Sequence, residues 1–337
     1  MSLMAKLQKN SRVVGTAVLD KSEFFQEKEL INIDVPMMNV ALSGRLDGGL
    51  GSGLTVLAGP SKHFKTSFAL KIAGAYMNSD PEAIMLFYDS EFGSPQSYFE
   101  NFGIDTSRVL HTPITNVEEL KFDLINQLEE IGKNDKVIIV IDSIGNLASK
   151  KELDDALNEK GVADMSRAKA LKGLFRMSTP YLTMKNIPLL AINHTYKEIG
   201  LFPKDIVGGG TGIYYSADNI WILGRRQNKK GTEITGYVKE KSKIPISVSW
   251  DGGIERYSGL LDIALAGGYV TKPSNGWYQL VDRATGEVIG TKVREKDTLT
   301  PEFWRDMLAD ETFVDFVKQM YSIVGASTLT LDLQEEF

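Results

Sequence analysis

The amino-acid sequence predicts an α/β fold with a mainly parallel sheet flanked by helices on both faces. The first observation is a series of short, unbroken apolar runs, which are typical of strands buried on both sides. The second is that stretches with helical spacing separate these runs, as in a parallel sheet with crossover helices. The third is that polar residues follow four of the runs, at the edge of the sheet where ligands bind in such folds.

The predicted elements alternate along the middle of the chain. Strands are predicted over 54–58 (LTVLA), 84–88 (IMLFY), 137–142 (VIIVID), 188–193 (PLLAIN) and 219–223 (NIWIL). Helices are predicted over Thr66–Met77, Val117–Ile131 and Asp164–Met184. Because the carboxyl ends of parallel strands share one edge, we expect the polar residues there to form one site.

Composition narrows the possible classes of protein. The chain has 337 residues, of which 42% are hydrophobic and 24% charged, as in an ordinary globular protein. No apolar stretch approaches the roughly 20 residues needed to cross a membrane, and Met1–Asn10 does not resemble a secretory signal. The absence of cysteine fits a reducing cytoplasm. With a net charge of −6, any binding of DNA must depend on local basic and backbone groups.

Two regions flank the predicted core. Residues 1–35 read as an N-terminal arm with a helix over Ser22–Leu30 followed by the β-like INIDV. Residues 251–337 contain several glycine-rich turn signals and a helical stretch near Pro301–Val324, which predicts a small α+β domain. The domain organisation is therefore an oligomerisation arm over 1–35, a core over 36–250 and a C-terminal domain over 251–337.

The loop after the first strand has the pattern of a phosphate-binding loop. Residues 59–66 read GPSKHFKT, close to the G-x-x-x-x-G-K-[ST] motif between a strand and a helix. Backbone N–H groups would hold phosphate oxygens, Lys65 would reach the terminal phosphates, and the Thr66 hydroxyl would bind Mg²⁺. Phe64 replaces the second glycine, so we expect a bulky ring close to the phosphates. The predicted nucleotide-binding residues are Gly59, Pro60, Ser61, Lys62, His63, Phe64, Lys65, Thr66 and Ser67.

Two carboxylates at strand ends complete this prediction. Asp142 lies where a nucleotide site needs an acid for Mg²⁺, although a strand-end Asp can also simply cap a turn. Glu91 could orient and deprotonate the attacking water, and Asp89 is the competing candidate for that role. Both could otherwise be solvated charges at the start of a loop.

Several longer segments resemble RecA-family recombinases, especially the UvsX-like recombinases of T-even-type bacteriophages. UvsX-like proteins also lack the second loop glycine. The resemblance implies a RecA-like core that uses ATP and Mg²⁺, polymerises on single-stranded DNA and exchanges strands with homologous duplex DNA. It also implies mediator and single-strand-binding partners and the cytoplasm of an infected bacterium. The matching segments are 36–50 (PMMNVALSGRLDGGL), 57–66 (LAGPSKHFKT), 86–93 (LFYDSEFG), 137–160, 191–200 (AINHTYKEIG), 208–212 (GGGTG), 216–226 (SADNIWILGRR), 251–265 and 272–278 (KPSNGWY).

The resemblance also assigns roles to single residues. Lys65, Glu91 and His194 would be catalytic, His194 being the sensor of the γ-phosphate, and Thr66 and Asp142 would hold the metal. Tyr98 would stack on adenine, or would otherwise be a core aromatic. Two loops would bind DNA, one over Leu153–Asp164 and one from His194 to Gly212. The predicted DNA-binding residues are Arg167, Lys197, Ile199, Gly208, Gly209, Gly210 and Gly212.

The chain departs from the family pattern after Arg225-Arg226, where it is shorter. In RecA-like filaments, lysines from this region reach the neighbouring subunit's ATP, and Lys239, Lys241 and Lys243 are the available substitutes. This departure leaves two points open: whether the sheet is complete, and whether a neighbouring subunit activates ATP hydrolysis. Two other functions therefore stay open, namely a RecA-like hexameric helicase motor and a non-catalytic nucleotide-binding recombination scaffold.

Overall fold

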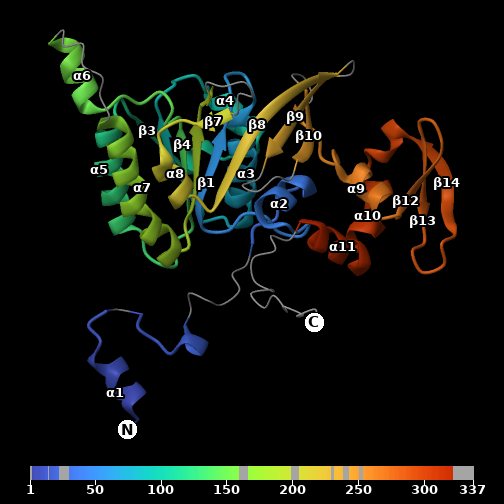
Figure 1. Ribbon diagram of the computed structural model, residues 1–337, viewed down its shortest axis with the longest axis horizontal. Coiled ribbons are helices and arrows are strands. Elements are labelled where there is room, and N and C mark those ends of the chain that lie inside the picture. Colours follow the sequence, from blue (N-terminus) through green and yellow to red (C-terminus); the bar gives the residue numbers. More distant parts are fainter. Residues whose placement is uncertain are drawn as a thin grey trace, which may run out of the picture.

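The computed structural model describes residues 2–13, 15–22, 30–158, 166–198, 205–228, 231–237, 243–249 and 253–321. Its central feature is a twisted sheet, seen nearly edge-on between helices in Figure 1. Within these residues the sheet has nine strands in the order β11-β10-β9-β8-β1-β5-β4-β2-β3. The strands are β1 (Gly53–Ala58), β2 (Ile84–Asp89), β3 (Val109–Pro113), β4 (Val137–Asp142), β5 (Pro188–Asn193), β8 (Asn219–Asn228), β9 (Gly231–Tyr237), β10 (Lys243–Ser249) and β11 (Gly253–Ile254).

The parallel part of the sheet confirms the predicted fold class. The pairings β8–β1, β1–β5, β5–β4, β4–β2 and β2–β3 are all parallel. Each of the five predicted strands is present, and β3 at the edge was not predicted. Strands β1, β4 and β5 are buried at every position, which explains why they read as unbroken apolar runs.

Helices cover both faces of the sheet (Figure 1). On one face, α5 (Val117–Glu130), α7 (Ser166–Met184) and α8 (Thr211–Ser216) enclose a core that includes Leu124 and Phe175. On the other, α2 (Pro36–Ser43) and α3 (Lys65–Ser79) pack with Trp221, whose indole donates to the Ala41 carbonyl oxygen at 3.2 Å. The three predicted helices are confirmed within a few residues at their ends.

The shortened region after Arg226 still completes the sheet. Strands β8, β9 and β10 form an antiparallel meander, in which Ile222 is opposite Tyr237 and Ile246 is opposite Ile234. Ile244, Ile246 and Val248 point into the core beside α2 and anchor β10. The doubt about the sheet is thereby removed, whereas Lys239 and Lys241 lie outside the described residues.

The C-terminal region is a small α+β unit that joins the core through the α2 side. It contains α9 (Leu260–Ala266), a sheet of β12 (Val270–Ser274), β13 (Trp277–Val281) and β14 (Val288–Arg294), and the helices α10 (Pro301–Ala309) and α11 (Glu311–Tyr321). The helical stretch predicted near Pro301–Val324 is confirmed as far as Tyr321, and it forms two helices separated at Asp310. Asp310 is extended between the two helices, and its carboxylate accepts the Thr312 N–H at 2.8 Å to start the second.

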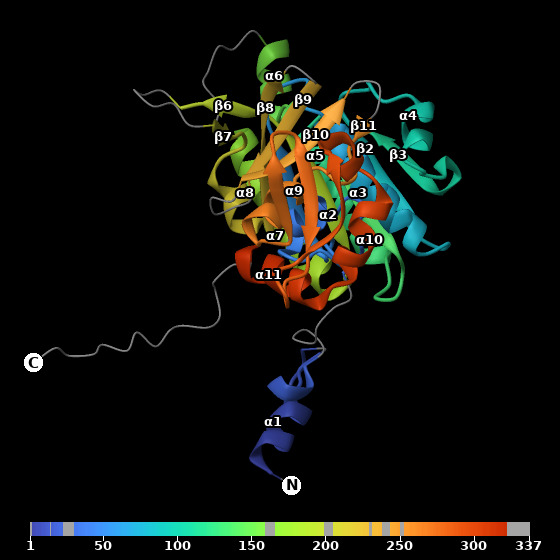
Figure 2. The same ribbon diagram turned by 90° about the vertical axis from the view of Figure 1, so that its right-hand side faces the viewer.

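The N-terminal region lies away from the body of the molecule (Figures 1 and 2). It contains α1 (Leu3–Asn10), which has no buried residue, and a short 3-10 helix over Leu19–Lys21. Most of the helix predicted over Ser22–Leu30 falls outside the described residues. The β-like INIDV forms a single bridge, from Ile31 to Leu50. Within the described chain no helix is both long and apolar enough to cross a membrane.

Candidate nucleotide-binding site

The loop between β1 and α3 has the backbone of a phosphate-binding loop. Phe64 precedes the first helical residue with φ 57° and ψ 23°, and Lys62 has φ 61°. This left-handed conformation normally favours glycine at the position of Phe64. The Phe64 ring is partly buried and packs against the hydrophobic core, and its expected position close to the phosphates stays a prediction. Packing of the ring therefore offsets the backbone strain that a non-glycine residue introduces.

Gly59 is required by close approach of the neighbouring strand. A Cβ atom on Gly59 would lie 2.9 Å from the Leu223 carbonyl oxygen of β8. The Gly59 N–H donates to the carbonyl oxygen of Asn193 at 3.3 Å, which joins the loop to the end of β5. The start of the loop is thus fixed between two strands of the sheet.

Lys65, Thr66 and Asp142 come together at the carboxyl end of the sheet. The Thr66 hydroxyl donates to Asp142 Oδ2 at 2.8 Å, and Lys65 Nζ donates to the Pro60 carbonyl oxygen at 2.9 Å. Lys65 is buried, and burial lowers its pKa against the opposing influence of Glu91 and Asp142. A buried ammonium group that donates to a neutral carbonyl oxygen is suited to a polyanionic phosphate.

The residues present also fit Mg²⁺. Asp142 Oδ1 is buried and, within the described chain, has no hydrogen-bond partner. Burial raises the pKa of Asp142 to about 6, and nearby Glu91 and Asp89 add to the effect. A divalent cation would neutralise this carboxylate beside the Thr66 hydroxyl. Mg²⁺ is commonly bound by one or two protein oxygen ligands together with substrate phosphates and water.

Glu91 is held in place from the neighbouring strand end. Its Oε1 atom accepts from Ser143 Oγ at 2.7 Å and from Asn146 Nδ2 at 3.0 Å. His194 Nε2 lies 3.6 Å from the same oxygen. The sequence analysis missed Ser143 and Asn146, although both follow the strand that ends at Asp142 and could have been found by that position.

His194 is packed tightly at the root of the second loop. A Cβ atom on Gly145 would lie 2.3 Å from His194 Cδ2, so only glycine fits beside the ring. Burial and then Lys65 lower the pKa of His194 against the influence of Glu91. The imidazole is therefore neutral near pH 7, and one ring nitrogen can act as a hydrogen-bond acceptor.

Asp89 has a different environment from Glu91. It is 5% exposed, and its Oδ1 atom accepts the backbone N–H groups of Glu91 at 3.0 Å and Phe92 at 2.8 Å. A carboxylate engaged in this way has little access to an attacking water. The geometry favours Glu91 over Asp89 as the general base.

Tyr98 lies above the first turn of α3. It belongs to α4 (Gln96–Asn101), its hydroxyl is 2.5 Å from Ser67 Oγ, and its ring meets Phe102 edge to face. The ring is half-buried and packs against the core. Tyr98 therefore lies next to the loop and is also partly packed against the core, so its position is compatible with both predictions made for it.

The second predicted DNA-binding loop contains a two-stranded hairpin within the described residues. β6 (Thr195–Lys197) pairs with β7 (Asp205–Val207), and Lys197 forms an ion pair with Asp205 at 2.8 Å. The expectation of an irregular loop is corrected over these residues, because alternate backbone groups pair across the hairpin. Ile199 lies outside the described residues.

The glycines after this hairpin approach other chain segments closely. Gly209 and Gly210 have φ of 92° and 79°. A Cβ atom on Gly212 would lie 2.9 Å from the Lys172 side chain of α7. Gly208 N–H donates to the His194 carbonyl oxygen at 2.9 Å and its carbonyl accepts from Asn193 Nδ2 at 2.7 Å. These contacts close the base of the hairpin beside the nucleotide site.

The first predicted DNA-binding loop also contains regular structure. α6 (Lys150–Leu157) has a capping box in which Ser149 and Glu152 bond reciprocally, so the loop prediction is wrong for 153–157. Residues 159–164 lie outside the described part. Arg167, at the start of α7, donates to backbone carbonyl oxygens at 2.6–2.9 Å, namely those of Ile144, Gly145 and Leu147.

The fold and this strand-end arrangement define the class as an α/β protein with a phosphate-binding loop. The RecA N-terminal domain model matches residues 19–248, and the model of the bacteriophage T4 recombination and repair protein, C-terminal domain, matches residues 257–317. The chain belongs to the RecA family.

Individual relatives agree with the family models. The chain is 49% identical over 336 residues to the recombination and repair protein of Enterobacteria phage T4, which covers 95% of this chain and 86% of that protein. It is 27% identical over 270 residues to Protein RecA of Streptomyces rimosus, covering 75% of this chain and 69% of that protein. Protein RecA of Mycoplasma mycoides subsp. mycoides is 26% identical over 264 residues, which cover 72% of this chain and 74% of that protein. The resemblance stated from the sequence is thereby confirmed.

Replacing Asp142 with Asn should raise the stability of the nucleotide-free protein above about pH 6 while weakening the use of Mg²⁺. The pKa of Asp142 in the folded protein, about 6, exceeds the ordinary aspartate pKa of 3.8, so protonation favours the folded state. The stability gained from the proton is fully present below the unfolded pKa and is lost as pH rises through the folded pKa. At about pH 8 the ionised carboxylate should cost on the order of 2–3 kcal/mol.

Thermal unfolding of both proteins across pH, with and without Mg²⁺·ATP, checks this. The variant should melt higher than the wild type near pH 8 without ligand, and the two should converge near pH 4. Mg²⁺·ATP should stabilise the wild type more than the variant. A variant that melts lower at every pH would contradict the assignment of an unfavourable buried charge.

Proposed function

We propose that this protein is a DNA-dependent ATPase of the recombinase type, which forms helical filaments on single-stranded DNA and exchanges strands with homologous duplex. One observation carries the proposal. The candidate general base Glu91 lies 3.6 Å from His194, at the root of the hairpin that would contact DNA. A conformational change at the DNA-binding loop or at the nucleotide can thus affect the other through the contact between Glu91 and His194.

The proposed roles follow the geometry of the site. ATP binds with its phosphates on the loop Gly59–Thr66, where Lys65 stabilises the charge that develops on the transferred phosphoryl group. Thr66 and Asp142 hold Mg²⁺, which when bound neutralises phosphate charge. Glu91 orients and deprotonates the attacking water, and Tyr98 stacks on adenine. His194 senses the γ-phosphate through its contact with Glu91.

The proposed DNA interface lies at one end of the molecule. α6 and the β6–β7 hairpin both project from the end of the body where the parallel strands terminate (Figure 2). Lys197 is exposed, and the glycines Gly208, Gly209, Gly210 and Gly212 bring backbone close to a ligand. Ile199, which lies outside the described residues, is proposed to insert between base steps. We expect sequence-independent binding that weakens with salt, since phosphate contacts dominate it.

Self-association is supported by two exposed surfaces. α1 and the following segment expose Leu3, Leu7 and Val13, and no residue of α1 is buried within one subunit. At the far edge of the sheet, β3 pairs only with β2 among the described strands, and Leu110 is exposed. The exposed apolar side chains of the arm and the edge of β3 are both surfaces that a second copy of the chain would cover.

The proposed domain roles are an oligomerisation arm over 1–35, an ATPase core over 36–250 and a C-terminal domain over 251–337. Mediator and single-strand-binding proteins are the proposed partners in phage DNA recombination, repair and replication. The proposed site of action is the cytoplasm of the infected bacterium, where the DNA is present.

Measuring ATP hydrolysis with and without single-stranded DNA tests the proposal. DNA should raise the rate severalfold or more, and electron microscopy with a non-hydrolysable ATP analogue should show helical filaments. Rings that unwind a forked duplex would instead indicate a hexameric helicase motor. ATP binding without turnover on saturating DNA would indicate a scaffold. Equal rates with and without DNA would count heavily against the recombinase.

Replacing Arg167 with Ala should show whether Arg167 positions the segment beside Glu91 or contacts DNA directly. Arg167 donates to carbonyl oxygens of the segment that carries Asn146, so its loss should loosen Glu91 and lower ATP turnover about tenfold. The salt dependence of DNA binding should be unchanged. Lys169→Ala, which removes an exposed cation from the same helix, is the matched control. A salt slope reduced by about one with turnover preserved would show that Arg167 contacts phosphate instead.

A further inference from the structure

The backbone around Glu91 is shaped by the side chain of Asp89. The carboxylate accepts the N–H groups of Glu91 and Phe92, and this turn carries Phe92 at φ 55°, a left-handed value that disfavours a bulky residue. Ser90 bonds to the end of β4, with its N–H donating to the Asp142 carbonyl oxygen at 2.8 Å. The position of Glu91 therefore depends on Asp89 on one side and on the β4 end on the other.

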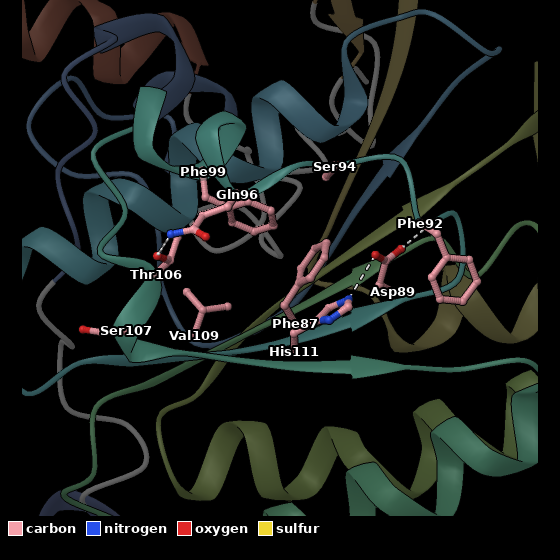
Figure 3. Close-up of a pocket in the computed structure, with 10 residues that line it drawn as sticks. All are labelled: Phe87, Asp89, Phe92, Ser94, Gln96, Phe99, Thr106, Ser107, Val109 and His111. Atoms are coloured by element: carbon pink, nitrogen blue, oxygen red, sulfur yellow. Dashed lines mark hydrogen bonds and ion pairs between the residues drawn. The ribbon is translucent and has the colours of Figure 1, made fainter.

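His111 of the edge strand β3 fixes the carboxylate of Asp89. Its Nε2 atom is 3.1 Å from Asp89 Oδ2, the oxygen that the turn does not use. The imidazole stacks on Phe87 with ring centroids 5.8 Å apart and planes inclined by 24°. Figure 3 shows the ring and the carboxylate facing one another, with Phe92 on the far side of Asp89.

The surroundings make His111 a supporting residue of the site and not a core residue. Its side chain is 52% exposed. A cavity of about 630 Å³ lies beside it, between β3 and α4, and the aromatic rings of Phe87 and Phe99 form part of its wall (Figure 3). Removing the imidazole would therefore extend an existing open space and would not create a void in the core.

We propose that His111 and Asp89 are positioning residues for ATP hydrolysis, forming a chain from the free sheet edge to the general base. His111 orients the Asp89 carboxylate, Asp89 fixes the turn, and the turn aims Glu91. The inference rests on the proposed role of Glu91. Edge strand β3 would then also regulate ATP hydrolysis. A second copy of this chain that packs along β3 would contact the exposed His111 and alter the turn that carries Glu91.

The test uses the full chain with His111→Ala and His111→Gln, measured at saturating single-stranded DNA. His111→Ala should lower kcat about tenfold and change KM for ATP less than about twofold, since the phosphate loop is untouched. His111→Gln places an amide N–H near the lost Nε2 and should restore most of the rate. Free imidazole should also restore much of the rate to His111→Ala, because the exposed cavity admits it. Asp89→Ala should lower kcat further, by about a hundredfold.

Thr106→Ala is the matched control, because Thr106 lines the same cavity and bonds to Gln96, not to Asp89. It should keep the wild-type kcat. A wild-type kcat for His111→Ala would overturn the inference, as would a loss that neither glutamine nor imidazole restores, or a rise in KM at constant kcat. If Glu91→Gln keeps full turnover, the proposed role of Glu91, on which the inference rests, fails. An inactive Glu91→Gln beside a fully active His111→Ala refutes the positioning chain alone.

Discussion

Replacing Lys65 with Ala should abolish measurable ATP turnover, with a loss on the order of a thousandfold or more. Lys65 is the buried cation at the phosphate loop, and its Nζ atom contacts the Pro60 carbonyl oxygen in the same loop. Two carboxylates, Glu91 and Asp142, lie near enough to raise its pKa against the effect of burial. Without the ammonium group, neither the bound triphosphate nor the charge that develops in the transition state is neutralised.

The measurement is phosphate release on saturating single-stranded DNA, together with nucleotide binding and thermal unfolding. Lys71→Ala is the matched control, because Lys71 lies on the same helix and forms a partly exposed ion pair with Asp34 at 2.8 Å. It should keep the wild-type rate. Because Lys65 is a desolvated charge in the nucleotide-free protein, its loss should leave that protein folded. Turnover by Lys65→Ala within tenfold of the wild type would show that the loop is not the phosphate site.

Replacing Glu91 with Gln should lower hydrolysis by about a hundredfold to ten-thousandfold while ATP still binds. The amide oxygen of Gln can accept from Ser143 and Asn146 as Oε1 does now, so the local geometry is kept. An amide cannot take the proton of the attacking water. If hydrolysis releases DNA, complexes of this variant with ATP and single-stranded DNA should also dissociate more slowly.

Rates of phosphate release and of DNA dissociation, measured on the same preparation, check both effects. Glu100→Gln serves as the control, because Glu100 is an exposed carboxylate on α4 that bonds to Gln96 and not to the site. A variant that hydrolyses ATP at the wild-type rate would remove Glu91 as the general base. A variant that is inactive but releases DNA as quickly as the wild type would separate hydrolysis from DNA release.

Much of the core could be predicted because its signals are local. The strands at 54–58, 137–142 and 188–193 are buried on both faces, so each appears as an apolar run that needs no knowledge of its neighbours. Edge strand β3 could not be predicted in this way. Its residues are partly exposed and mixed in character, because only β2 pairs with it. The break at Asp310 was missed because helical spacing continues through it.

The same difference between local sequence signals and contacts made on folding applies to the candidate site. The loop Gly59–Thr66 and the strand-end residues Glu91, Asp142 and His194 could be predicted from local motifs, because a parallel sheet brings its carboxyl ends to one edge. The contacts that support these residues could not be predicted. Asn146, in the loop after β4, bonds to Glu91, and His111 of β3 bonds to Asp89, and no periodicity encodes such contacts. The packing of the Phe64 ring against the core and the bonds of Arg167 to backbone carbonyls also arise on folding, because both depend on which surfaces become buried together.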